Sequence, residues 1–327
     1  MPLLALLLLL VLLPAAAAAD GPLERFAYAR AHLGTRVRIV LYAPDEATAD
    51  DAAEAAYDRV IELNAILSDY SSSSEVSRLS TEAVTAPVAI SHELWTVLEM
   101  ANRLWRASDG AFDAAIGPVV ALWREARRSG VLPSAEARAA ALARSGWQHV
   151  TLDPLARTVQ LGREGMKLDL GGLAKGYIGD EVIATLTARG FPHCLFEAGG
   201  DTVLGAPPPG EAGWSIAFTD GTSRELSYCG VAASGDTAQY VVIGGRRYSH
   251  VVDPRTGLGL TSRRLSHVIA PRGLESDGLA TAVGVLDAAA GRALLAAWPG
   301  AQGWVHTVTD PPQPDLRPRR LGERGLF

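Results

Sequence analysis

The chain has 327 residues, 48% of them hydrophobic, and a formal net charge of −6. A chain of this length can bury a large core, and its acidic balance argues against the class of proteins that bind nucleic acid through clustered Lys and Arg. Only Cys194 and Cys229 are present. A metal site built from cysteines is therefore excluded, and the apolar setting of each cysteine favours two buried thiols over a disulfide bridge.

The N-terminal segment has the pattern of a secretory signal peptide. An apolar run over 3–13 is followed by small residues over 15–19, and the first charge is Asp20. The run is too short to cross a bilayer of roughly 30 Å as a helix. We expect cleavage after residue 19 and export to the periplasm. An uncleaved anchor stays open as an alternative, because no Lys or Arg precedes the apolar run.

The next part of the chain is predicted to be mainly helical. Residues 35–42 alternate polar and apolar side chains, which indicates a half-buried strand. Residues 46–68 place apolar side chains at helical spacing with acidic residues early, as the helix dipole favours. A break is expected over 69–74. Further helices are expected over 93–107, 119–128 and 134–144.

From residue 150 onward the pattern becomes rich in strands. Helices are expected only over 173–189 and 276–298. Short glycine turns such as Gly244-Gly245 indicate antiparallel hairpins, so the expected fold class is α+β rather than a doubly wound parallel sheet. One two-lobed unit is expected over 20–310, followed by a Pro- and Arg-rich tail over 311–327. The predicted strands are 150–153, 158–161, 166–170, 194–197, 214–218, 239–243, 248–252, 267–270 and 304–308.

A glycine-rich segment over 169–177 joins a predicted strand to a predicted helix. Glycines let a backbone approach a ligand closely, and the N–H groups at a helix start attract anions. Lys175 lies in the first turn, where it could neutralise a phosphate. The segment therefore predicts a phosphate cradle, although paired glycines before a helix also fit an ordinary turn.

Asp277 and Thr281 are four residues apart in a predicted helix, so their side chains share one face. Two oxygen donors on one face suit Mg²⁺, which takes few protein ligands and completes its shell with water and substrate phosphate. The alternative is an acidic residue that merely stabilises the helix dipole beside an ordinary Thr.

His250 is placed by the alternation of residues 248–252 on a predicted strand that ends at the Asp253-Pro254 turn. An imidazole beside a tight turn can transfer a proton near neutral pH. A hydrogen-bonded structural His is the alternative. Other motifs are absent from the sequence: no Walker A, Rossmann, G-x-S-x-G or H-E-x-x-H pattern occurs. A nucleotide cofactor would have to be held in some other way.

Taken together, the motifs resemble the ApbE family of FAD:protein FMN transferases over nearly the whole mature chain. That resemblance implies an α+β, T-fold-like architecture. It also implies binding of FAD, cleavage of its pyrophosphate with release of AMP, and transfer of FMN through a phosphoester bond to a Thr or Ser of an acceptor flavoprotein. The matching stretches, in order, are Leu67–Tyr70, Ser74-Glu75, Gly110–Asp113, Gly117-Pro118, Asp169–Gly176, Glu197–Asp201, Ala233–Asp236, Ser249–Gly257 and Ser276–Thr281.

The resemblance also implies roles for individual residues. Mg²⁺ would be held by Asp277, Thr281 and the backbone oxygen of Gly172. Leu33 stands where Met is more usual, and Ala280 where some members carry another acidic ligand, so only two side chains are offered to the metal. The implied FAD contacts are Leu33, Tyr70, Ala111, Phe112, Asp113, Asp169, Lys175 and Val251.

His250 is the candidate for deprotonating the acceptor hydroxyl. Asp236 or Asp253 could do this instead, or could orient the imidazole. Two rival functions use the same residues: a metal-dependent FAD pyrophosphatase, in which water replaces the acceptor, and a non-catalytic exported FAD carrier. The expected partner is an exported or membrane-bound electron-transport subunit that receives the flavin.

Overall fold

The computed structural model describes residues 22–235 and 240–307. The predicted signal peptide, the tail over 311–327 and Asp236 lie outside these residues. Within them, no helix is long and apolar enough to span a membrane.

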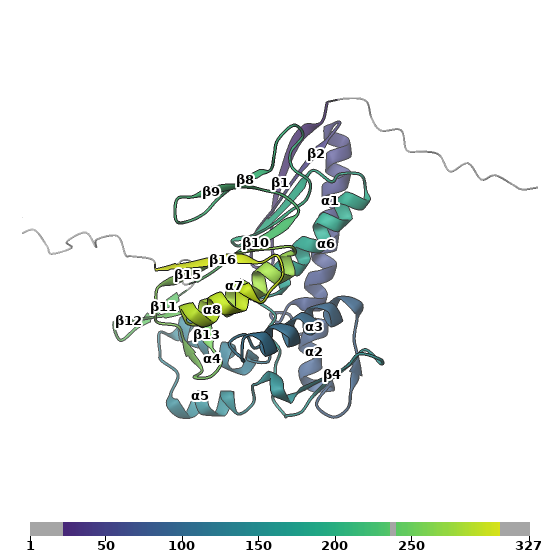
Figure 1. Ribbon diagram of the computed structural model, residues 1–327. Helices are drawn as coiled ribbons and strands as arrows, with labels where there is room; N and C mark the ends of the chain where they lie inside the picture. The colour runs from purple at the N-terminus through teal and green to yellow at the C-terminus, as the bar shows by residue number, and fades with distance from the viewer. Residues whose placement is uncertain (1–21, 236–239, 308–327) are drawn as a thin grey trace, which may run out of the picture.

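A seven-stranded antiparallel sheet forms the larger lobe (Figure 1). β1 and β2 are joined by Leu33 and Gly34, which both have positive φ, at 54° and 69°. A two-residue turn of this kind matches the right-handed twist of a hairpin. The antiparallel sheet and its packed helices confirm the predicted α+β class. The strand order is β1 (Glu24–His32), β2 (Thr35–Ala43), β6 (Cys194–Ala198), β7 (Asp201–Leu204), β10 (Cys229–Gly235), β15 (Arg264–Ala270) and β16 (Gln302–Thr307).

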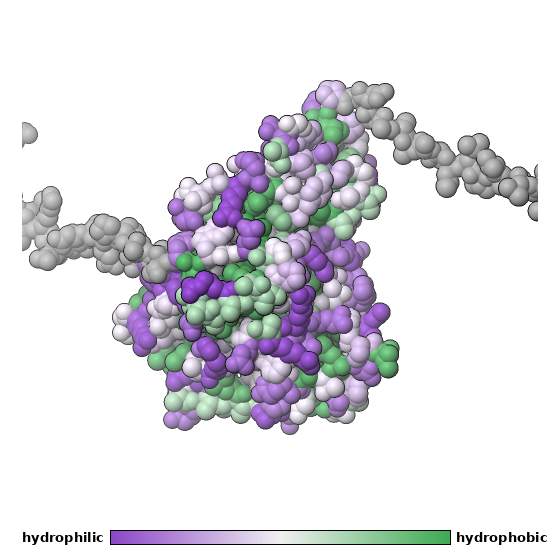
Figure 2. Space-filling model, in the orientation of Figure 1, coloured by the Kyte–Doolittle hydropathy of each residue, from purple (hydrophilic) through white to green (hydrophobic). Residues whose placement is uncertain are grey.

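Three helices cover one face of this sheet. α1 (Glu46–Leu67) packs on β2, α6 (Ala174–Ala188) on β6 and β7, and α7 (Gly273–Val285) on β10 and β15. α1 begins at Asp45, whose carboxylate accepts a hydrogen bond from the Thr48 amide. α8 (Ala288–Ala296) follows α7 and contacts β16, and its alanines form a pale green patch in Figure 2.

The opposite face of the sheet is covered by the hairpin of β8 (Trp214–Ala217) and β9 (Ser223–Leu226). Trp214 and Phe218 pack there against Val40, Leu195 and Ile269 in a separate apolar cluster. The central strands are therefore buried on both faces, whereas the edge strand β1 stays largely exposed.

The smaller lobe lies below the sheet in Figure 1 and is mainly helical. Long α1 reaches from the sheet into this lobe. The elements of the lobe are α2 (Glu75–Glu82), α3 (His92–Ala107), α4 (Gly117–Ser129), α5 (Ala135–Leu142), the 3₁₀ turn Trp147–His149, the sheet of β3 (Val88–Ala89), β5 (Thr158–Leu161) and β4 (Val150–Asp153), and the hairpins β11 (Tyr240–Ile243)–β12 (Arg246–Ser249) and β13 (Val252–Asp253)–β14 (Leu258–Gly259).

Three predicted elements were wrong. The helix expected over 276–298 is two helices, because Asp287 accepts from the Ala289 and Ala290 amides and begins α8. Residues 166–170 form no strand; their backbone instead bonds to the start of α4, through Gly117 N–H to Lys167 O at 3.1 Å. The strand expected over 248–252 is interrupted at residues 250–251.

Several elements gave no clear sequence signal. β10 is a central strand, yet it consists largely of Gly, Ala and Ser. A Cβ on Gly230 would lie 2.5 Å from the Gly273 Cα, so the small residues allow α7 to approach the sheet. β1, β7 and α2 were also missed. Both thiols are free; Cys194 is buried as expected, whereas Cys229 is only partly buried. Burial raises the pKa of Cys194 to about 12.

Candidate active site

Two helix starts meet at a pair of glycines. A Cβ on Gly176 of α6 would lie 2.1 Å from the Gly273 carbonyl oxygen, and a Cβ on Gly273 of α7 would lie 2.4 Å from the Gly176 oxygen. No side chain larger than hydrogen fits either position without moving backbone. This close crossing brings Lys175 and Asp277, from segments about a hundred residues apart, into one buried site.

The two helices cap each other. Neither α6 nor α7 has a side-chain cap at its own N-cap residue. The Asp277 carboxylate of α7 instead accepts from the Gly176 amide of α6 at 3.1 Å. Asp180 of α6 accepts from the Gly273 and Leu274 amides at 2.6 and 3.0 Å. Burial raises the pKa of Asp180 to about 6. Each carboxylate satisfies amides that would otherwise be unpaired, so the crossing has one fixed geometry.

Lys175 lies between two buried carboxylates. Its Nζ is 2.7 Å from Asp201 Oδ2 and 3.6 Å from Asp277 Oδ2. Burial, together with the charge of Asp277, raises the pKa of Asp201 to about 7, although Lys175 opposes the shift. Two carboxylates face one ammonium, so the site carries surplus negative charge when both are ionised. Sequence reasoning gave Asp201 no role beyond its motif, and Asp180 was missed altogether.

The proposed metal donors lie together. Asp277 and Thr281 are one turn apart on α7, and a Cβ on Gly172 would be 2.9 Å from the Thr281 Oγ1 and 3.3 Å from the Phe112 ring. Within the described ranges, no group of three or more His, Cys, Asp or Glu residues is gathered to hold a metal. This donor set fits Mg²⁺: it offers one carboxylate, one hydroxyl and one backbone oxygen beside surplus negative charge. Mg²⁺ keeps several of its coordination positions for water and phosphate.

Arg124 of α4 links two of the predicted FAD contacts. Its guanidinium is 4.0 Å from the centre of the Tyr70 ring and donates to Asp169 Oδ2 at 2.9 Å. It also pairs with Asp69 at 2.6 Å. Burial and the nearby charge of Asp69 raise the pKa of Asp169 to about 6 against the effect of Arg124. The Tyr70 side chain is 76% exposed, so a supported aromatic face is offered to a planar ligand.

Two of the sequence motifs meet at a cavity of about 500 Å³. One wall includes Gly110 and Asp113, and another includes Pro254 and Arg255. Asp113 accepts from the Ala115 and Trp147 amides at 2.7 and 3.0 Å, so its carboxylate orders the surrounding backbone. Ala111 and Phe112 are buried beside it.

Leu33 is joined to the Lys175 site through the turn between β6 and β7. A Cβ on Gly199 in that turn would lie 3.5 Å from Thr35 and 3.8 Å from the Lys175 side chain. Thr35 is two residues from Leu33, which holds a left-handed backbone that is rare for a bulky residue. This backbone belongs to the β1–β2 turn, and the FAD contact of Leu33 stays a prediction.

His250 lies in a short bend between β12 and β13, not on the strand that the alternation predicted. The bend is held by the Ser249 amide, which donates to Leu260 O at 2.7 Å, and by the Val251 amide, which donates to the Ser249 hydroxyl at 3.0 Å. A two-residue interruption cannot be seen in a period-2 pattern. Val251 is buried, and its contact with FAD stays a prediction.

The Asp253 carboxylate is occupied by hydrogen bonds within its own turn. Its carboxylate accepts two hydrogen bonds from the Arg255 guanidinium, at 2.9 and 3.0 Å, and one from the Arg255 amide. These contacts weaken the alternative in which Asp253 takes a proton from the acceptor. The other alternative, Asp236, lies outside the described residues.

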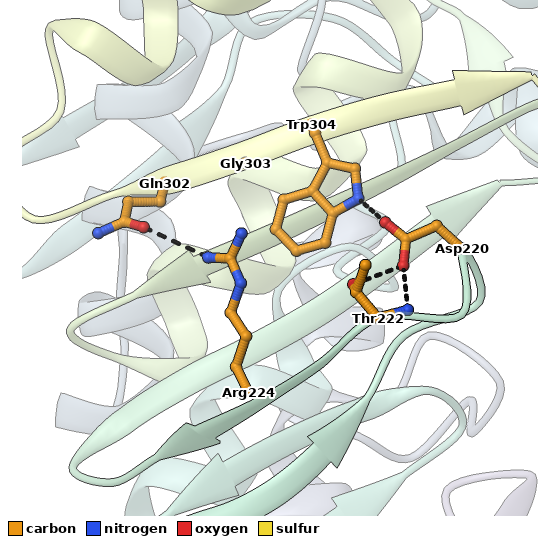
Figure 3. Close-up of a pocket in the computed structure, with 6 residues that line it drawn as sticks. All are labelled: Asp220, Thr222, Arg224, Gln302, Gly303 and Trp304. Carbon is orange, nitrogen blue, oxygen red and sulfur yellow. Dashed lines mark hydrogen bonds between the residues drawn. The ribbon is translucent and has the colours of Figure 1, made fainter.

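A second cavity, of about 380 Å³, lies between the β8–β9 hairpin and β16 (Figure 3). The Trp304 indole donates to Asp220 at 2.8 Å, and Arg224 extends toward Gln302. None of the predicted site residues lines it. Its polar contacts hold the hairpin against the sheet edge.

Comparison with known proteins gives a consistent result. A family model described as the ApbE family matches residues 33–303. The FAD:protein FMN transferase of Treponema pallidum is 31% identical over 298 residues, which cover 84% of this chain and 82% of that protein. The FAD:protein FMN transferase of Vibrio cholerae is 32% identical over 253 residues, which cover 73% of this chain and 75% of that protein.

Solved structures agree with these sequence relatives. The flavin transferase ApbE from Vibrio cholerae superposes with a TM-score of 0.78 at 29% identity, covering 88% of this chain and 95% of the other. The apo form of the Pseudomonas stutzeri flavinyl transferase ApbE gives a TM-score of 0.74 at 28% identity, covering 83% and 88%.

Proposed function

The chain belongs to the ApbE family, and from this premise we propose that it transfers FMN from FAD to a Thr or Ser hydroxyl of an acceptor flavoprotein. The acceptor oxygen bonds to the phosphorus of the FMN half, and the bond from that phosphorus to the bridging oxygen breaks. AMP leaves with the bridging oxygen, and the hydroxyl proton passes to a base. The observation that carries the proposal is the α6–α7 crossing, which gathers Lys175, Asp201 and Asp277 beside Thr281.

We propose that Tyr70 and Lys175 bind opposite ends of the flavin nucleotide. The exposed Tyr70 ring, supported by Arg124, offers a surface on which a flavin can stack. Lys175 supplies positive charge for the pyrophosphate. The Gly176 amide is already used by Asp277, so the charge of Lys175 matters more for the phosphates than the helix start does.

Asp277, Thr281 and the Gly172 backbone would hold Mg²⁺. When bound, this ion would offset charge on the phosphoryl oxygens, which is the main demand of phosphoryl transfer. Asp201 holds the Lys175 ammonium at the edge of the same site. Phe112 packs close to Gly172 and Thr281 and limits the space beside these donors.

His250 would take the proton from the acceptor hydroxyl. Its bend is fixed by hydrogen bonds on both sides, so the imidazole is carried by an ordered backbone. Correct placement of the base matters as much as its pKa for proton transfer.

The test is mass spectrometry of unflavinylated candidate acceptors after incubation with the protein, FAD and Mg²⁺. We expect a covalent FMN on one Thr or Ser, and no such adduct in EDTA. Free FMN and AMP without an adduct would instead indicate a pyrophosphatase, and intact FAD would indicate a carrier.

We further propose that the acceptor is an exported or membrane-bound electron-transport subunit and that the enzyme works in the periplasm. The apolar N-terminal pattern over 3–19 supports this proposal. Intact-mass measurement of protein from an exporting host should give a mature chain that begins near Asp20. A retained N-terminus would favour a membrane anchor.

A further inference from the structure

The β11–β12 hairpin has an unpaired edge. Among the described residues, β11 (Tyr240–Ile243) pairs with β12 (Arg246–Ser249) alone, in a two-stranded sheet. In the part of the chain that the structure describes, no other strand lies along the outer side of β11. A strand edge of this kind is a template for pairing with an extended segment of another chain.

The register of the hairpin identifies the groups on that edge. Gly244 and Gly245 form a two-residue turn with φ of 58° and 76°, so the flanking pair, Ile243 with Arg246, exchanges hydrogen bonds. Bonded and non-bonded pairs alternate in an antiparallel ladder. The N–H and C=O groups of Tyr240 and Val242 therefore point outward, away from β12.

The side chains of β11 divide between two faces. Val241 and Ile243 pack inward with Tyr248 on the apolar cluster around α4. Tyr240 and Val242 point the other way and are 43% and 56% exposed. The anchored inner face keeps the hairpin ordered, while the outer face offers apolar surface next to the free edge.

The cation of Arg247 completes this outer face. Its guanidinium lies 3.3 Å from the centre of the Tyr240 ring. Val242 stands directly opposite Arg247 in the ladder. An apolar strip with one stacked cation suits a segment with apolar side chains at alternate positions.

The free edge leads to the candidate base. Tyr240 stands directly opposite Ser249, and His250 is the next residue along the chain. The glycine turn lies at the far end of the hairpin. The Tyr240 end of β11 is therefore the end nearer to His250, and a segment paired with β11 would run toward that end.

We propose that the acceptor protein docks by adding an extended segment, next to its Thr or Ser, to the outer edge of β11. The segment would exchange hydrogen bonds with the main-chain groups of Tyr240 and Val242 and place apolar side chains on the outer face. The inference rests on the proposed function, because it names how the partner of that reaction is held.

Val242→Pro tests the docking edge. Proline removes the outward N–H of residue 242 but no hydrogen bond of the hairpin itself, because that N–H does not bond to β12. The probe is the unflavinylated acceptor identified by mass spectrometry. We expect KM for this acceptor to rise roughly tenfold, as loss of one hydrogen bond and close strand contact implies, with FAD affinity unchanged. Val242→Thr keeps the N–H and should stay within about twofold of wild type.

Amide hydrogen exchange supplies a second measurement that does not depend on the variant. Saturating acceptor should slow exchange at Tyr240 and Val242 of the wild-type protein. Exchange at Val241, which bonds to β12, reports whether the variant keeps its hairpin.

The outcomes separate the two proposals. An unchanged KM in a Val242→Pro protein with an intact hairpin overturns docking at β11, as does unchanged exchange at Tyr240 and Val242. If the variant hairpin opens, the wild-type exchange result decides. Failure of the wild-type protein to flavinylate any acceptor would overturn the proposed function instead.

Discussion

The α6–α7 crossing and the β11–β13 segment carry different parts of the proposed site and are built in opposite ways. At the crossing, paired glycines and buried carboxylates fix two helices against each other. The β11–β13 segment consists of short two-stranded hairpins with an exposed edge. Rigid packing suits the part proposed to hold phosphates and a cation, and an open edge suits the part proposed to admit a protein. The two regions should therefore fail differently when altered.

Loss of the Asp277 charge should have the largest effect. Asp277→Ala and Asp277→Asn should both lower the rate of FMN transfer by roughly 10³-fold or more, because loss of this carboxylate weakens binding of the cation that would offset the charge of the phosphates. The Asn variant keeps an oxygen that can accept from the Gly176 amide. It therefore distinguishes the effect of losing the charge from the effect of losing the helix cap. Steady-state transfer assays with added Mg²⁺ measure the loss. Exposed Asp51→Ala is the matched control, and full activity in EDTA would defeat the metal assignment.

His250→Ala should come next and should affect chemistry alone. Transfer should fall by the roughly 10²–10⁴-fold typical of a general base, while FAD affinity, measured by flavin fluorescence, stays near wild type. His92→Ala, at an exposed histidine, is the control and should change neither the transfer rate nor the FAD affinity. Loss of both FAD binding and transfer would make His250 a structural residue of the pocket. The β11–β13 segment would then not differ from the α6–α7 crossing in the way proposed.

The sequence predicted these two regions unequally. The spacing of Asp277 and Thr281, and the glycines before Lys175, could be read directly because helical spacing and glycine turns are local properties. Asp180 and Asp201 could not be assigned, since their partners are brought in by a helix crossing that no local pattern encodes. His250 was placed on a strand because a two-residue bend interrupts the alternation too briefly to register. β10 was missed for a related reason. Its small residues are required by the close approach of α7, which no local pattern reveals.

The reciprocal caps predict a pH dependence of stability. The pKa of Asp180 is raised to about 6, above its value of about 3.9 in an unfolded chain. The native state therefore binds the extra proton between these values, and the contribution of Asp180 to stability is lost as pH rises from about 4 to about 7. The free energy of unfolding of wild type minus that of Asp180→Asn should fall by ~2–3 kcal/mol over this range. Urea titrations at several pH values measure it. A difference that grows with pH would contradict burial as the cause of the shift.

Thr281 should give the smallest effect. Thr281→Ala removes a neutral oxygen donor that water can replace, so transfer should fall only about tenfold and should recover at higher Mg²⁺ concentration. Thr281→Ser retains the hydroxyl and should stay close to wild type. Mg²⁺ titrations of the transfer rate distinguish them. Equal losses in both variants would assign Thr281 to packing rather than to the metal.

The central claim is that the charges gathered around Lys175 serve the transfer of FMN from FAD to a protein hydroxyl. The most direct measurement is the amount of AMP released compared with the amount of FMN covalently bound to the acceptor in the same reaction. The account predicts one AMP for each FMN attached, with AMP release dependent on the acceptor. AMP release that continues unchanged without the acceptor, or that exceeds bound FMN many times over, would contradict it.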